Sequence, residues 1–229
     1  MTAPGRGVVH PRVPARRGGA RAGTWWARAW LRAAEEAAYD EADLVAARRL
    51  ARSGRIGGII VDVGTFVAAV EDDGGLWTTS GTVPVLDEPA RQAFVETVAA
   101  EAGRVAALLA GDLPHTLVEH AEDAGVELLP YGGELGATCT CTSWTDPCVH
   151  ALAVLHQLAW LLEGDPFVLL HLRGLPRDEL LARLHARSGP AAPEEDPAEV
   201  DADTAYDAAL RAARALDLLA DGRPVDHLF

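Results

Sequence analysis

The residues best suited to chemistry lie close together in the third quarter of the chain. The 229-residue sequence has three cysteines, Cys139, Cys141 and Cys148, and His150 follows two residues after the last of them. Zinc in proteins is commonly held by four cysteine and histidine ligands in a tetrahedron. The Cys-x-Cys-x6-Cys-x-His spacing therefore predicts a zinc ion as cofactor. Because protein side chains would fill all four positions, we expect a closed structural site rather than a catalytic one.

The backbone around these residues must bend for their side chains to converge. Because alternate residues of an extended strand point to opposite faces, Cys139 and Cys141 must lie on a tight bend. Residues 143–147 can reverse the chain, which places Cys148 and His150 in the first turn of the following helix. The helix dipole favours thiolates at that end.

The composition favours a helix-rich protein without membrane spans. Apolar residues make up 49% of the chain, enough for a sizeable core, and alanine and leucine dominate them. No apolar run reaches the roughly 18 residues that span a bilayer, and the N-terminus lacks the apolar core of a signal peptide. We therefore predict a cytoplasmic protein with no membrane partner. A reducing compartment disfavours disulfide bonds, so the cysteines are better suited to bind zinc. The odd number of cysteines also argues against a set of disulfide bonds.

Charge is distributed unevenly along the chain. The net charge is −14, yet residues 1–34 hold seven arginines and no acid, whereas residues 190–229 hold three arginines and ten acids. Residues 1–23, rich in Gly, Pro and Arg, are predicted to be a disordered basic arm. Residues 189–203 have the composition of an acidic, Pro-rich linker, and residues 204–229 are predicted to contain a C-terminal amphipathic helix. The overall acidity argues against a large nucleic-acid surface.

Between these ends, the periodicity of apolar residues predicts an α+β fold. Thr24 suits the N-cap of a helix of about 15 residues, along which Trp25, Trp26 and Trp30 recur at helical spacing. β-branched residues predict two strands within 56–70 and a third over 76–85. Helices are expected over 88–110, 113–124, 148–162, 167–172 and 177–187. We therefore predict a helix-rich fold in which a small antiparallel sheet packs against helices and the zinc finger is embedded.

These elements suggest three consecutive regions. Residues 24–130 form the predicted α+β domain, residues 131–172 the zinc finger with its following helix, and residues 173–188 a helical extension. Because an unfolded chain has no preformed metal site, zinc binding contributes directly to folding. We expect the metal to order residues 131–172.

The cysteine pattern resembles a known family. Cys-x-Cys, a short spacer and Cys-x-His leading into an apolar helix resemble the SWIM zinc finger. Three other segments are similar to bacterial SWIM finger proteins and occur in the same order: Thr24 to Trp30, Leu109 to Pro114 and Asp165 to Leu175. The resemblance covers about residues 24–187. It implies zinc binding and a role in DNA-associated or protein–protein interactions, since bacterial members are often linked to Snf-type helicases.

Two functions follow from this resemblance. The first is a non-enzymatic protein-interaction module that serves a Snf-type helicase or another DNA-processing assembly through its apolar finger helix. The second is a direct nucleic-acid binder that uses the basic arm and the tryptophans, although helical spacing favours a core position for the tryptophans. Family members commonly carry a basic residue where this chain has Val149. The finger therefore lacks a positive charge that could bind a phosphate. An enzyme is not expected, because no phosphate loop or nucleophile elbow is present.

Other histidines are candidates for minor roles. His156 lies about 240° around the helix from His150, so it faces elsewhere. It could be a buried structural histidine or could orient a metal ligand. His115 and His120 lie near Glu119, but this spacing matches no acid–base motif, and a solvated face is expected.

Overall fold

A computed structural model describes residues 7–16 and 22–187. The chain divides into two units, Met1–Leu184 and His185–Phe229, and only the first three residues of the second unit are described. The predicted linker at 189–203 and the predicted helix within 204–229 lie outside the described residues.

The described residues form an α+β fold, which confirms the predicted class. The strands are β1 (Val8–His10), β2 (Ile56–Asp62), β3 (Thr65–Asp72), β4 (Gly75–Thr82) and β5 (Gly136–Cys139). The helices are α1 (Trp25–Glu36), α2 (Glu41–Arg52), α3 (Glu88–Ala99), α4 (Ala102–Leu109), α5 (His115–Asp123), α6 (Val149–Gly164), α7 (Pro166–Leu172) and α8 (Arg177–Arg187), with a short 3-10 turn, η1 (Gly132–Glu134).

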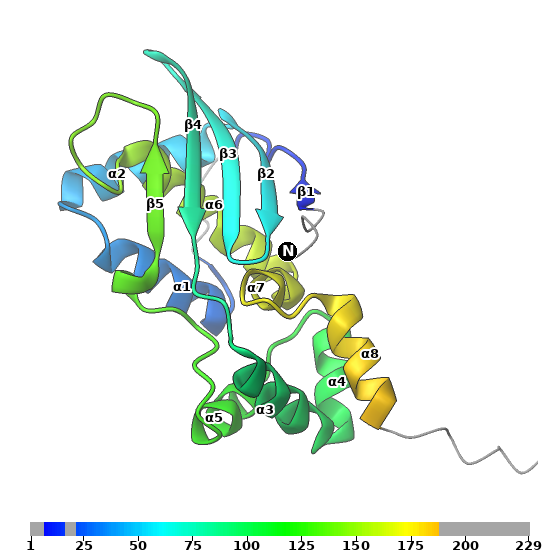
Figure 1. Ribbon diagram of the computed structural model, residues 1–229. Coiled ribbons are helices and arrows are strands. Elements are labelled where there is room, and N and C mark those ends of the chain that lie inside the picture. Colours follow the sequence, from blue (N-terminus) through cyan, green and yellow to red (C-terminus); the bar gives the residue numbers. More distant parts are fainter. Residues whose placement is uncertain (1–6, 17–21, 188–229) are drawn as a thin grey trace, which may run out of the picture. The chain divides into compact units, whose positions relative to one another are not determined.

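The five strands form one antiparallel sheet in the order β1-β2-β3-β4-β5 (Figure 1). Along β3 the side chains alternate between exposed and buried, so that Phe66, Ala68 and Val70 face the core. Gly81 of β4 lies opposite Phe66, and the Phe66 ring occupies the space that a side chain at Gly81 would need. In the described part of the chain, helices α6 and α7 pack against the inward face of the sheet.

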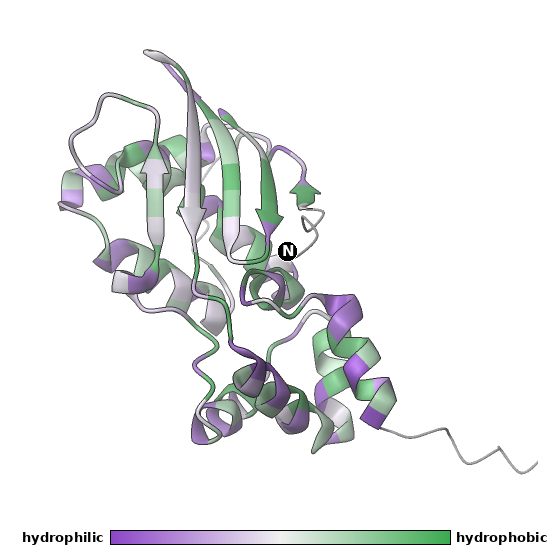
Figure 2. Ribbon diagram, viewed as in Figure 1, coloured by the Kyte–Doolittle hydropathy of each residue, from purple (hydrophilic) through white to green (hydrophobic). Residues whose placement is uncertain are grey.

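Helix α6 is the centre of the core. It contacts β3, β4 and β5 on one side and α1 and α2 on the other, and Figure 2 shows its hydrophobic colouring behind the sheet. Eleven of its sixteen residues are buried, which explains why its sequence is apolar on every side. The prediction that this helix provides a docking surface is therefore wrong: its apolar side chains are already packed. Among the described helices, none is both long and apolar enough to cross a membrane.

The tryptophans of α1 anchor that helix to α6. Thr24 caps α1, its side chain accepting a hydrogen bond from the Ala27 N–H, as predicted. Trp26 and Trp30 are buried, and their indole N–H groups donate to carbonyl oxygens near the end and in the middle of α6. Trp25 is half-buried and donates to the Leu113 carbonyl oxygen. The predicted core stripe is confirmed, and Trp26 and Trp30 are unavailable for stacking on bases.

The N-terminal arm differs from the prediction of disorder over residues 1–23. Val8–His10 form β1 and pair with Val61, Ile60 and Ile59 of β2. Further on, the Arg16 N–H donates to the Arg52 carbonyl oxygen. A strand this short carries too little sequence signal to be recognised, and its order comes from backbone hydrogen bonds to β2.

Two points of the helix prediction also need correction. Helix α2 was not predicted, although Asp40 caps it, acids lie in its first turn and arginines in its last. The single helix expected over 88–110 is two helices, α3 and α4, separated at Ala100 and Glu101.

The histidines of α5 lie on a solvated face, as expected. His115 and Glu119 pair at 3.1 Å, and both side chains are more than half exposed. His120 lies against the buried Arg104, whose guanidinium also donates to the Glu101 carboxylate. These contacts hold α4 and α5 together.

Candidate metal centre

The four predicted ligands meet where β5 ends and α6 begins. Cys139 is the last residue of β5, and the Thr140 N–H continues the pairing with β4 by donating to the Thr78 carbonyl oxygen. Cys141 follows the bend at the end of the strand. Cys148 is the N-cap of α6 and His150 lies in its first turn. The predicted bend and the predicted helix start are both confirmed.

The distances between the ligand atoms fit a zinc tetrahedron. The sulfur atoms of Cys141 and Cys148 are 3.6 Å apart, and His150 Nδ1 lies 3.7 Å from the sulfur of Cys139 and 4.0 Å from that of Cys148. All four ligand atoms lie within 4.8 Å of one another. Tetrahedral bonds of the usual zinc lengths would separate neighbouring ligand atoms by about 3.5–3.8 Å. Three thiols and one imidazole at these distances are the donor set of a structural zinc site, and the residues fit the ion.

The thiols differ in how readily they lose their protons without a metal. Burial raises the pKa of Cys148 to about 12. Burial also raises the pKa of Cys141, but hydrogen bonds from the Ser143 N–H and from neighbouring ligands outweigh it, and the pKa falls to about 7. A metal ion that binds here must therefore displace the proton of Cys148, because zinc binds the thiolate.

A carboxylate from the sheet orients the histidine, and the sequence analysis missed it. The Nε2 atom of His150 lies 2.7 Å from Oδ2 of Asp72, the last residue of β3. Since Nδ1 faces the sulfur atoms, the Nε2–H donates to Asp72. This carboxylate–histidine–metal arrangement fixes the imidazole tautomer and makes the ligand more basic. Asp72 is thus part of the metal centre although it lies 78 residues before the histidine.

Asp72 is itself held in place by the β3–β4 turn. Its other oxygen, Oδ1, accepts hydrogen bonds from the Trp77 indole at 3.0 Å and from the Gly74 N–H at 2.9 Å. The hydrogen bond from Trp77, followed by that from His150, lowers the pKa of Asp72 to about 2. The Trp77 ring also stacks on His150, with centroids 6.0 Å apart. The β3–β4 turn, which begins at Asp72, therefore also supports the metal ligand.

His156 does not orient a metal ligand. It lies on α6 away from the four ligands, buried between α1 and α2, and its Nδ1 contacts the Leu152 carbonyl oxygen at 2.8 Å. Of the two readings left open for this residue, the buried histidine is the one the structure supports.

The loop that joins the two ligand pairs presents an aromatic side chain to solvent. Trp144 is 78% exposed, and its ring meets that of Tyr39 edge-on with centroids 4.8 Å apart. Asp146 is the only charged side chain of the loop. One Zn²⁺ with three thiolates carries a net charge of −1, so the finger as a whole is negative when metal is bound.

Comparisons with known proteins agree with this geometry. Residues 123–159 match the family model of the SWIM zinc finger, a stretch that contains all four ligands. The chain is 32% identical over 184 residues to an uncharacterized protein of Mycobacterium tuberculosis, and the aligned part covers 79% of this chain and 66% of that protein. The chain thus spans just under two thirds of the relative's length. No solved structure matches the chain.

Proposed function

We propose that this chain, which carries a SWIM zinc finger, is a non-enzymatic protein-interaction module of the cytoplasm. Its proposed partner is a Snf-type helicase or a similar component of a DNA-processing assembly. The observation that carries the proposal is the exposed aromatic pair of Trp144, in the zinc loop, and Tyr39, in the turn between α1 and α2. Aromatic side chains of this kind are enriched at the energetic centres of protein interfaces.

The outer face of the sheet extends this apolar surface. Val9, Ile60 and Val67 are cross-strand partners on β1, β2 and β3, and all three are between 39% and 67% exposed. No helix among the described residues covers this face. A hollow of about 540 Å³ is lined by β3, β4 and β5 together with Asp146 and Pro147 of the zinc loop. The hollow links the sheet to the finger, and we propose the two as one docking surface for a protein segment.

Charge supports a protein partner over nucleic acid. The metal-bound finger is negative, Asp72 adds a carboxylate behind it, and no arginine or lysine lies between Cys139 and His156. Phosphate binding needs clustered positive charge. The alternative function, direct binding of nucleic acid, relied on three tryptophans of α1. Two of them, Trp26 and Trp30, are buried and cannot stack on bases. A partner segment with apolar and basic side chains matches this surface.

A binding measurement tests the proposal. The full zinc-loaded chain would be immobilised and a purified Snf-type helicase from the same organism passed over it. We expect Trp144→Ala and Val67→Glu each to weaken binding at least tenfold, about the effect of removing an interface hot spot. Leu109→Glu is the matched control, because Leu109 is similarly exposed but lies on α4, outside this surface.

Two results would contradict the proposal. If the helicase does not bind, the proposed partner is wrong. If Leu109→Glu weakens binding as much as Val67→Glu, the proposed surface is wrong. A parallel gel shift with duplex DNA is expected to show no complex at physiological salt, and a complex with a steep salt dependence would favour the nucleic-acid alternative.

A further inference from the structure

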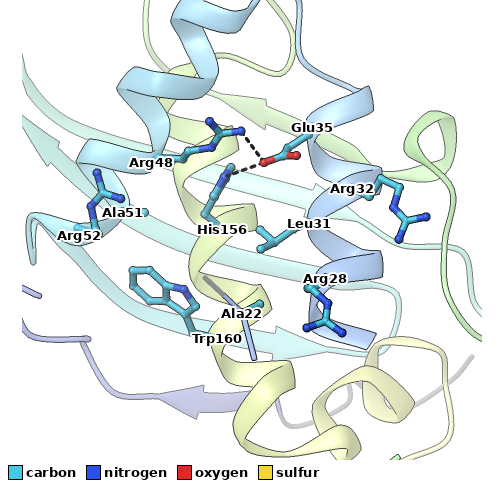
Figure 3. A pocket seen from close by; sticks show the side chains of 10 residues that line it. All are labelled: Ala22, Arg28, Leu31, Arg32, Glu35, Arg48, Ala51, Arg52, His156 and Trp160. Atoms are coloured by element: carbon cyan, nitrogen blue, oxygen red, sulfur yellow. Dashed lines mark hydrogen bonds and ion pairs between the residues drawn. The ribbon is translucent and has the colours of Figure 1, made fainter. Parts of the chain in front are cut away.

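A groove runs between α1 and α2 on the side of the core opposite the sheet. Both helices pack against α6 but make few contacts with each other, so α6 forms the floor between them. The groove has a volume of about 560 Å³, and Figure 3 shows side chains from all three helices along it. An apolar groove of this kind is a common docking place for an amphipathic helix of a partner protein.

The floor of the groove is apolar. Leu31 of α1, Ala51 of α2 and Trp160 of α6 line it. Ala51 is buried, whereas Leu31 and Trp160 are half-buried and pack against the core. Leu31 and Trp160 therefore still present apolar surface, and covering that surface with the apolar side chains of an occupant is favourable.

Arginines stand on both rims of this floor. Arg28 and Arg32 lie one turn apart on α1, and both are exposed. Arg52 lies on α2, and Figure 3 shows it on the opposite side of the groove, with Leu31 and His156 between the two rims. Burial lowers the pKa of His156, so the strip between the rims is uncharged at neutral pH.

The charge of the rims is not neutralised within the described part of the chain. None of Arg28, Arg32 and Arg52 forms an ion pair with a described residue. Of the described residues that line the groove, one is a carboxylate, Glu35, and it pairs with Arg48 at 2.6 Å. Three guanidinium groups thus remain for a partner, in a chain whose net charge is −14.

The separation of the rims selects the kind of occupant. A compact anion cannot reach arginines on both sides of an apolar floor at once. A helix can reach both when acidic residues flank its apolar stripe on either side, because each rim then meets its own carboxylates. In such a complex the apolar stripe contributes most of the affinity, and the exposed charges contribute the rate of association and the choice of partner.

Nucleic acid fits the groove less well than a protein helix. Bases bind aromatic side chains by stacking on a ring face. One face of the Trp160 ring already carries the Arg16 guanidinium, whose carbon lies 4.5 Å from the ring centroid, and the Trp160 side chain also packs against the core. The floor therefore offers apolar contact rather than a platform for bases.

We propose that the groove between α1 and α2 binds an acidic amphipathic helix of a partner protein. The apolar stripe of that helix lies on Leu31 and Trp160, and its carboxylates pair with Arg28 and Arg32 on one rim and with Arg52 on the other. None of these residues lines the hollow at the sheet and the zinc loop. The chain then has two separate binding surfaces, a groove for an acidic helix and a sheet face for a segment with apolar and basic side chains.

The test uses three labelled peptides and the full zinc-loaded chain. The first peptide has about 20 residues, long enough to form a helix, with leucines at positions i, i+3, i+4 and i+7 and glutamates on both sides of that stripe. The second has lysine in place of each glutamate, and the third is a scrambled sequence of the first. Fluorescence anisotropy is expected to show saturable binding of the glutamate peptide, with the lysine and scrambled peptides at least about tenfold weaker.

A charge reversal separates the proposed contact from a general effect on the fold. Arg28→Glu/Arg52→Glu changes one residue on each rim. We expect it to weaken the glutamate peptide at least about tenfold and to strengthen the lysine peptide at least about tenfold, because opposite charges then face each other again. A variant that had lost its fold would not gain a ligand, and unchanged zinc content provides a second check.

Arg49→Glu is the matched control. Arg49 is an exposed arginine of the same helix as Arg52, but it does not line the groove. This variant should bind the glutamate peptide within about twofold of the wild type, since exposed charges outside the contact are screened by salt.

Four results would overturn the proposal. The glutamate peptide could fail to bind at millimolar concentration, or the scrambled peptide could bind as tightly as the glutamate peptide. Arg49→Glu could weaken binding as much as the double variant, or the double variant could fail to gain the lysine peptide. A single-stranded oligonucleotide that displaces the glutamate peptide, with a dependence on Arg28 and Arg52, would likewise replace the protein helix by nucleic acid as the occupant.

Discussion

Removal of the Asp72 carboxylate tests whether the sheet supports the metal ligand. Asp72 accepts the His150 Nε2–H on one oxygen and the Trp77 and Gly74 N–H groups on the other. Asn at this position has a single acceptor oxygen, so it can accept either from His150 or from the Trp77 and Gly74 N–H groups. Its NH2 group would then face the other donors, with which it cannot form a hydrogen bond. Ala removes every one of these contacts.

The expected magnitude follows from the role of such carboxylates. Loss of the group that orients a histidine ligand typically lowers metal affinity about 10–100-fold, or roughly 1.4–2.7 kcal/mol. We expect Asp72→Asn near the lower end and Asp72→Ala near the upper end. The assay is zinc competition against a chromophoric chelator of known affinity, at neutral pH.

The neighbouring aspartate supplies the control. Asp73 pairs with Arg55 at 2.8 Å, but its side chain is 94% exposed and contacts no metal ligand. Asp73→Asn removes the same charge from the same turn and should change zinc affinity less than about twofold, as expected for exposed charges. If Asp72→Ala and Asp73→Asn bind zinc equally well, the hydrogen bond to His150 does not support the metal, and the reasoning is refuted.

Two other predictions concern protons and packing. Zinc binding to the metal-free chain at pH 7 should release at least about one proton from Cys148 and about half a proton from Cys141, because their pKa values are about 12 and about 7. Zinc affinity should therefore fall as pH falls, and calorimetry in buffers of different ionisation enthalpy counts the protons; a count near zero would contradict it. Gly81→Ala should destabilise the fold by about 1–3 kcal/mol, because the new methyl group would overlap the Phe66 ring and lie 2.7 Å from the Gly136 carbonyl oxygen. Gly103→Ala, in helix α4 with nothing within 4 Å of the new atom, should stabilise by about 0.5–1 kcal/mol, and urea unfolding of both variants checks the pair.

The metal ligands could be predicted because their geometry is local. Cys148 and His150 are two residues apart at the start of a helix. The other two ligands, Cys139 and Cys141, reach them through a bend at the end of β5. The Thr24 N-cap and the tryptophan stripe of α1 were predictable for the same reason, since caps and helical spacing are read within a few residues.

The rest of the site depends on contacts between distant parts of the chain. Asp72 reaches His150 only because the β3–β4 turn lies beside the start of α6, and in the sequence an Asp-Asp-Gly-Gly segment signals no more than a turn. His156 meets the arginines of α1 and α2 in a pocket that no local pattern reveals.

Two elements were missed for different reasons. Helix α2 carried local signals, with Asp40 at its N-cap and Leu44, Ala47 and Ala51 on one face, so closer reading could have found it. Strand β1 carried none, because three residues in a segment rich in Gly, Pro and Arg become a strand only when β2 offers them hydrogen bonds.

The zinc content of the purified protein tests the central claim most directly. Elemental analysis of the wild-type chain should give close to one zinc per chain, and Cys148→Ser should lose most of it, because the hydroxyl of serine is a far weaker zinc ligand than a thiolate. Near-stoichiometric zinc in the wild type that is lost in the variant is the predicted result. A wild-type protein without zinc, or a Cys148→Ser variant that retains it in full, would contradict the assignment of Cys139, Cys141, Cys148 and His150 as a closed structural site.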